Sequence, residues 1–317
     1  MRWLLIPLVA STAIACRGAG PGPAAPSELS PPLASHAVPT ALVLVSGETE
    51  APIAGARLSV GGDELVSDAG GHVVLPAGAS EVRIVAAGYL ERWTAVSTPL
   101  LSLWPSLSPT GLDEAATGRL VYGCGELGCP GGGAPLVRLR HGGATLVPAP
   151  ELLADAAAMD ALEEGARRLS SATRGEVVID VAPSAPGSGP VVTATIDPAD
   201  PVIVSLGAGA VTRLHLDGRL EIASAAIAFR SLELARRLPL VLHELGHAFG
   251  LGHSARSDDL MWPGPEIYGR SGFSPREVLA VRLMLQRDAG NRFPDDGRGR
   301  AAAEAAPRTA VFACVRR

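Results

Sequence analysis

The chain has 317 residues, of which 47 % are hydrophobic, and this length favours two packed domains over one. Its formal net charge of −5 gives no reason to propose a nucleic-acid partner, and we expect none. Nothing in the composition indicates subunit association, and we expect a monomer.

Residues 1–15 are typical of a secretory signal peptide, because Arg2 precedes an apolar run that ends in small residues and is too short to span a bilayer. The next residue completes the tetrapeptide Ala-Ile-Ala-Cys, which resembles a bacterial lipobox although Ala13 replaces the usual Leu. The resemblance implies that Cys16 carries a lipid anchor in the membrane. Ordinary cleavage near Ala15, which would leave Cys16 as a plain thiol, is the alternative. Either route places the mature protein outside the cytoplasm, secreted or in the bacterial cell envelope (outer membrane or periplasm).

Residues 16–39 are rich in Pro, Gly, Ala and Ser, which predicts a flexible tether. Residues 40–104 predict a small antiparallel β-sandwich, because short β-prone runs alternate with Gly- and Pro-containing turns. The expected strands are 41–45, 56–60, 71–75 and 81–86. The turn segments 52–56, 67–71 and 87–89 make the whole stretch resemble the carboxypeptidase regulatory-like sandwich, which implies a module without chemistry of its own.

Residues 105–114 are the expected linker, 115–290 the second domain and 291–317 an irregular C-terminal tail. Hydrophobic periodicity and capping signals predict the elements of the second domain. They are strands 119–122 and 136–140, a helix over 151–169, strands 176–181 and 202–206, a hairpin of 211–216 with 220–229, and helices 238–249 and 274–287. Asp217-Gly218 favours the hairpin turn, and Ser274 with Glu277 predicts a capping box.

The most specific motif of the chain is His-Glu-Leu-Gly-His at 243–247, extended by Gly250 and His253. On a helix, His243 and His247 project from one face and can bind a single metal ion. Gly250 allows the helix to end with a positive φ, so that the chain returns His253 to the same ion. Three histidine ligands leave a position open for water, which is typical of catalytic zinc, and Glu244 is then the expected general base.

This motif resembles the active site of the metzincin zinc endopeptidases. The segment Leu260-Met261-Trp262-Pro263 resembles their Met-turn, whose methionine lies beneath the metal without binding it. The short gap and Pro263 are more similar to matrixins than to branches that carry a Tyr at that position. Tyr268 is therefore only a candidate for contacting substrate or the oxyanion. The Cys-containing propeptide motif of matrixin zymogens is not evident, although a thiol switch stays open.

The resemblance implies an α+β fold, in which a twisted mixed sheet with long helices and a Met-turn forms the catalytic domain beside the small all-β sandwich. It also implies that the strand before the active-site helix, here 220–229, is a sheet edge lining the cleft. Extended peptides add to such edges through main-chain hydrogen bonds.

The remaining candidates for bonds or ligands have weaker support. Cys124 and Cys129 are close enough in sequence for a local disulfide, with a zinc site as the competing interpretation, and Cys314 would then be unpaired. Asp197 and Asp200 could bind calcium, but their spacing matches no calcium motif.

The sequence therefore predicts a secreted or lipid-anchored endopeptidase with one catalytic Zn²⁺ and a protein or peptide substrate. Two alternatives stay open. One is a cell-surface binding lipoprotein with a catalytically silent zinc site, and the other is a zinc hydrolase of non-peptide amides.

Overall fold

The structure is a computed structural model that describes residues 41–123, 135–140, 142–298 and 308–313. The predicted signal peptide, the tether and all four cysteines, Cys16, Cys124, Cys129 and Cys314, lie outside the described residues. Within those ranges, no helix has both the length and the apolar character required to cross a membrane.

Two small sheets form the first part of the described chain. One has the order β4-β1-β7 and the other β3-β2-β5-β6. Their strands are β1 (Ala41–Ser46), β2 (Arg57–Val60), β3 (Asp63–Val66), β4 (His72–Val74), β5 (Glu81–Val85), β6 (Arg92–Ala95) and β7 (Leu100–Leu103). Alternate side chains of both sheets enter one shared core, which includes Leu42, Leu44, Leu58, Ile84 and Leu103. The expected strands are present, but the pairing of β1 with β7 is parallel, which the all-antiparallel expectation missed.

A larger sheet follows, with the order β10-β9-β11-β13-β12-β14 and the short β8 paired to β13. Its strands are β8 (Arg138–Leu139), β9 (Gly142–Pro148), β10 (Val177–Val181), β11 (Val191–Ile196), β12 (Ala210–Leu216), β13 (Glu221–Phe229) and β14 (Arg308–Ala313). Strands β10, β9, β11 and β13 are parallel, whereas β12 is antiparallel to both β13 and β14. The sheet is therefore mixed, and the protein belongs to the α+β class as expected.

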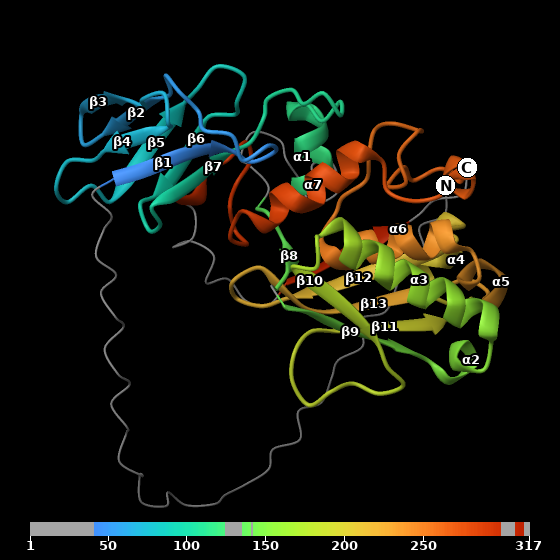
Figure 1. Ribbon diagram of the computed structural model, residues 1–317. Helices are drawn as coiled ribbons and strands as arrows, with labels where there is room; N and C mark the ends of the chain where they lie inside the picture. Colours follow the sequence, from blue (N-terminus) through green and yellow to red (C-terminus); the bar gives the residue numbers. More distant parts are fainter. Residues whose placement is uncertain (1–40, 124–134, 141, 299–307, 314–317) are drawn as a thin grey trace, which may run out of the picture. The chain divides into compact units, whose positions relative to one another are not determined.

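Helices and one 3₁₀ turn accompany this sheet. They are α1 (Glu114–Tyr122), α2 (Pro150–Leu153), α3 (Ala156–Ala172), α4 (Pro201–Leu206), α5 (Leu232–Ala235), α6 (Leu238–Phe249), η1 (Pro265–Gly269) and α7 (Pro275–Leu285). Figure 1 shows α3 running across the strands of the large sheet. Gly165 of α3 packs on α6, since a Cβ there would lie 3.0 Å from side chains of Val241 and Leu245.

Two segments predicted as strands are helices. Residues 119–122 belong to α1, which Asp113 caps at its start and Gly123 ends in the left-handed conformation. Residues 202–206 belong to α4, where Asp200 caps the first turn and Gly207 ends the last. In both cases β-branched residues indicated a strand, but the capping residues on each side fix a short helix. The predicted helix over 151–169 is also interrupted, because Asp155 caps a new helix, α3.

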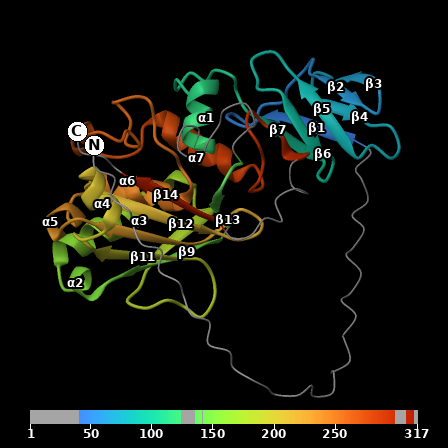
Figure 2. The same ribbon diagram turned by 180° about the vertical axis from the view of Figure 1, so that it is seen from behind.

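The hairpin of β12 and β13 is confirmed, but two expectations about its surroundings are wrong. Strand β13 is interior, since β11 and β12 flank it, so segment 220–229 is not a sheet edge. The tail 291–317 is not wholly irregular, because its residues 308–313 form β14 and pair with β12. Figure 2 shows β14 beside β12 from the other side of the sheet.

Candidate metal centre

The helix α6 presents the first two histidines. Pro239 stands in its first turn, where the missing N–H costs little, and the helix ends at Gly250 with a φ of 122°. A Cβ at Gly250 would lie 2.3 Å from the carbonyl oxygen of Val137, so only glycine fits there. Gly252 lies equally close to the main chain of α1, because its Cβ would be 2.3 Å from the Arg119 oxygen. This tight exit directs the chain back to His253.

The three histidines converge on one point. The Nε2 atom of His247 lies 3.0 Å from that of His243 and 3.1 Å from that of His253. All three side chains are buried. Among the residues that the structure describes, these three form the one group of His, Cys, Asp or Glu side chains arranged to hold a metal ion. The spacing predicted from the sequence therefore does bring the three side chains together.

Main-chain acceptors fix the tautomers of two of the rings. The Nδ1 atom of His243 lies 2.7 Å from the Leu260 oxygen, and that of His247 lies 2.8 Å from the Leu251 oxygen. Because a carbonyl oxygen only accepts, each Nδ1 carries the proton and donates it. Each Nε2 of these neutral rings then presents a lone pair to the other. Such facing lone pairs repel unless a cation lies between them, so the donor set fits a metal ion.

Burial keeps these rings neutral. It lowers the pKa of His243 to about 3, with the nearby His253 adding to the effect. Burial also holds the pKa of His247 well below its ordinary value, and both neighbouring histidines contribute. Neutral imidazole is the form that binds metal ions, so the protein environment prepares the ligands for coordination.

Glu244 lies beside this cluster and is fully buried. Its Oε2 accepts a 2.6 Å hydrogen bond from the hydroxyl of Thr212 on β12, whereas its Oε1 has no hydrogen-bond partner among the described residues. Burial raises the pKa of Glu244 to about 8, and the hydrogen bond from Thr212 opposes this rise. A divalent cation held by the histidines would also oppose it, because a nearby positive charge favours the ionised carboxylate. Nothing in the sequence indicated the role of Thr212.

Met261 lies directly beneath α6. It is fully buried, and a Cβ at Gly246 would lie 2.6 Å from its sulfur atom. Glycine at position 246 therefore allows the methionine to approach the helix between the two histidines. The assignment of Met261 to a Met-turn stays a prediction, and the resemblance had not explained why residue 246 is glycine.

A buried polar network holds the loop that carries Met261. The Asp259 carboxylate accepts hydrogen bonds from Ser254, Ser274 and the Arg276 guanidinium, the last at 2.8 Å. The predicted capping box of α7 is confirmed. Its Glu277 also accepts from the main-chain N–H groups of residues 260 and 261, so α7 fixes the loop at the point where Leu260 meets His243. Asp259 and Arg276 were not found from the sequence because their pairing depends on the fold.

The C-terminal strand contributes the last side chain at the centre. The Phe312 ring on β14 is buried and stacks on the His247 ring, with 4.5 Å between centroids and 10° between planes. It also meets the His253 ring edge-on at 6.4 Å. No sequence signal linked a residue of the tail to the histidine motif.

The weaker candidates lie elsewhere. Tyr268 is partly buried on η1, where the Arg237 guanidinium lies 5.6 Å from its ring centroid, and its contact with substrate stays a prediction. Asp200 caps α4 and pairs with Arg213 at 2.6 Å, so its carboxylate already has structural partners. Asp197 accepts from the Ala199 N–H in the same loop. The suggested calcium site gains no support from these contacts.

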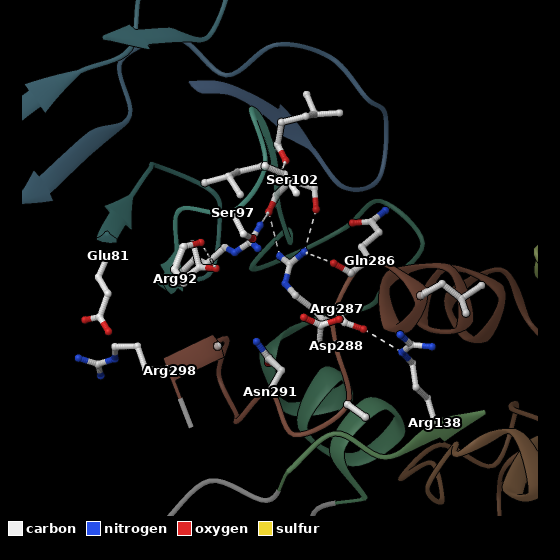
Figure 3. Close-up of a pocket in the computed structure, with 18 residues that line it drawn as sticks. Glu81, Arg92, Ser97, Ser102, Arg138, Gln286, Arg287, Asp288, Asn291 and Arg298 are labelled. Carbon is white, nitrogen blue, oxygen red and sulfur yellow. Dashed lines mark hydrogen bonds between the residues drawn. The ribbon is translucent and has the colours of Figure 1, made fainter. Parts of the chain in front are cut away.

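A separate polar pocket of about 450 Å³ lies between β6, β7 and the segment after α7 (Figure 3). Arg92 and Arg287 both donate to the main-chain carbonyl oxygen of Ser102, at 2.6 and 2.8 Å. Burial lowers the pKa of Arg92 to about 9, and the charge of Arg287 adds to this effect. None of the site residues predicted from the sequence lines this pocket. Both arginines donate to the protein's own oxygen atoms, and we interpret them as structural, although the Nε atom of Arg92 has no hydrogen-bond partner among the described residues.

No model of a known protein family matches the chain, and no curated protein is similar to it. The geometry of the site therefore carries the argument about function.

Proposed function

We propose that the protein is a zinc-dependent endopeptidase of metzincin type. The observation that carries this proposal is the convergence of three buried histidines beside a buried glutamate, one of whose oxygens has no hydrogen-bond partner among the described residues. The main-chain bonds to His243 and His247, the sharp helix end at Gly250 and the methionine beneath the helix support it.

Zinc is the metal that best suits this donor set. Three imidazole nitrogens with no thiolate or extra carboxylate are typical of catalytic zinc sites, in which a fourth position stays open. His243, His247 and His253 would hold the ion. Bound there, it supplies Lewis acidity toward water and toward the carbonyl group of a peptide.

Glu244 would serve as the general base. Its Oε1, which has no hydrogen-bond partner among the described residues, would accept a proton from the attacking water, and the same carboxyl group would then deliver that proton to the leaving amine. Thr212 holds Oε2 and so orients the carboxylate through its 2.6 Å hydrogen bond. Secretion, the lipid anchor on Cys16 and a regulatory-like sandwich remain parts of this proposal that rest on the sequence.

The test compares Glu244→Gln with the unchanged protein and with Glu163→Gln, a control at an exposed position on α3. Zinc content is measured by atomic spectroscopy and cleavage with a denatured protein substrate. Because Phe312 covers His247, each protein is assayed both as the whole chain and as a chain that ends at Pro307.

We expect about one zinc per chain in all three proteins and a loss of cleavage in Glu244→Gln of at least about 100-fold. Zinc-free protein would contradict the metal centre. Cleavage that survives in Glu244→Gln would contradict the role of the base.

A further inference from the structure

Strand β14 adds to the free edge of β12, the strand nearest to the proposed base. The two strands are antiparallel, with Thr212 opposite Phe312 and Leu214 opposite Ala310. Thr212 is the residue whose hydroxyl binds Glu244. The C-terminal segment therefore crosses the site at the level of the base, bound by the main-chain pairing that an extended peptide would use.

The side chains of β14 alternate as in a strand bound in a cleft. Ala310 and Phe312 are buried, whereas Thr309 and Val311 face outward, Val311 with 43 % of its surface exposed. The inward Phe312 lies flat on His247, a proposed metal ligand. The segment thus combines main-chain pairing with one apolar side chain at the reactive centre.

This strand also contributes to the burial of the site. His243, Glu244 and His247 have no exposed surface, and Phe312 contributes part of the cover over His247. An endopeptidase must admit an extended chain to these groups. The position such a chain would take along β12 is filled by the protein's own residues 308–313.

We propose that the C-terminal segment Arg308–Ala313 is an internal, substrate-like occupant of the peptide-binding edge of β12, and that it keeps the site latent until it leaves. The same geometry assigns a side-chain preference: an apolar, preferably aromatic, side chain of a bound peptide would lie against His247. This inference rests on the proposed peptidase function.

The segment can leave without unravelling the sheet. Strand β14 is bonded only to β12 among the described strands, and β12 keeps its full pairing with β13 on the other side. A terminal edge strand of six residues is also among the elements that open most easily.

The test uses the whole zinc-loaded chain, a chain that ends at Pro307, Phe312→Ala, and Val311→Ala as the matched control on the outer face of the same strand. The first measurement is the rate at which the chelator 4-(2-pyridylazo)resorcinol removes zinc. The second is cleavage of a quenched fluorogenic peptide. We expect truncation and Phe312→Ala to raise the rate of zinc removal at least about tenfold, and Val311→Ala to change it less than about twofold.

A peptide added in trans distinguishes the covering of the site by β14 from a general contribution of β14 to the stability of the fold. The synthetic hexapeptide with the sequence of residues 308–313 should slow zinc removal from the truncated chain and compete with the fluorogenic substrate. The same hexapeptide with Ala in place of Phe312 should bind about tenfold more weakly, since the ring covering His247 is lost.

Equal rates of zinc removal from the whole and the truncated chain would overturn the proposal. The proposal would also be overturned if circular dichroism shows that the truncated chain is folded and the hexapeptide changes neither zinc removal nor cleavage. Strand β14 would then be a purely structural strand. Faster zinc removal without any peptide cleavage would support the covering role and contradict the peptidase function. A chain that binds no zinc would contradict the proposed function itself.

Discussion

The core shared by the two small sheets and the region around α6 bury very different side chains. The core shared by the small sheets consists of aliphatic residues, including Leu42, Leu58 and Ile84. The region around α6 buries His243, Glu244, His247, Asp259, Arg276 and Glu277 in addition to its apolar core. Burying ionisable groups is unfavourable unless they are paired, so this contrast indicates which region has been shaped by a requirement other than folding.

The buried polar groups around α6 fall into two kinds. Asp259 and Arg276 satisfy each other, and their hydrogen bonds hold the loop beneath the helix. Oε1 of Glu244 has no hydrogen-bond partner among the described residues, and the Nε2 atoms of His243 and His247 lie 3.0 Å apart and face each other. Folding alone gives no reason to bring these atoms together, which is the physical case for a metal centre.

The largest expected effect comes from replacing one of the proposed metal ligands in the region around α6. We expect His243→Ala to lower zinc affinity at least about 100-fold, whereas His72→Ala, an exposed histidine of β4, should leave it unchanged. Zinc content after dialysis and the rise in melting temperature on adding zinc both measure this effect, because a ligand that binds only the folded state stabilises it. Full zinc content in His243→Ala would contradict the assignment of His243 as a metal ligand.

The second prediction concerns the structural kind of buried polar group. Asp259→Ala would remove the buried carboxylate partner of the Arg276 guanidinium and leave it only the exposed Asp258, and we expect the free energy of unfolding to fall by about 3–5 kcal/mol. Asp258→Ala is the control next to it, since Asp258 pairs with the same arginine from an exposed position and should cost at most about 1 kcal/mol. Urea unfolding measures both, and equal costs would contradict the assignment of Asp259 as a buried support.

The third prediction concerns the apolar core of the small sheets. Leu58 is fully buried there, and Leu58→Ala should lower the free energy of unfolding by about 2–5 kcal/mol through lost burial and a residual cavity. Zinc content per folded chain should not change, because Leu58 belongs to the cluster that contains none of the site residues. A matched loss of zinc in this variant would show that the two regions are energetically coupled, and the contrast would no longer hold.

Local signals in the sequence predicted the parts of the fold that depend on neighbouring residues. The hairpin turn at Asp217, the capping box of Ser274 and Glu277 and the spacing of the histidines all appear as expected. The signals failed where two local preferences competed. Residues 202–206 include β-branched side chains that favour a strand, yet Asp200 and Gly207 cap them as a helix.

The remainder of the site could not be predicted because it depends on pairs that are distant in sequence. Thr212 meets Glu244 only because β12 lies against α6, and Phe312 meets His247 only because β14 joins β12. No periodicity or motif links such residues. The sequence identified the histidines that could hold a metal ion, whereas the fold identified the groups that contact and cover them.

The smallest expected effect is a pH dependence from Glu277. Burial raises its pKa to about 7, the Asp259 carboxylate adds to the rise, and main-chain N–H donors oppose it. Between its ordinary pKa of 4.5 and about 7, the folded state therefore holds this proton more firmly than the unfolded state does. The contribution of Glu277 to stability is fully present below that window and declines as the pH rises through it.

Glu277→Gln cannot titrate, so its free energy of unfolding should fall less steeply over this interval than that of the unchanged protein. Chemical unfolding at a series of pH values between 4 and 8 measures the difference between the two slopes. Glu164→Gln on α3 serves as the control, because arginines lower the pKa of Glu164 to about 2 and this group does not titrate in the folded state over that range. Identical slopes for Glu277→Gln and the unchanged protein would show that Glu277 stays ionised. The acidic support beneath Met261 would then be a charged acceptor at every pH tested, and the contrast with the apolar sandwich core would be sharper still.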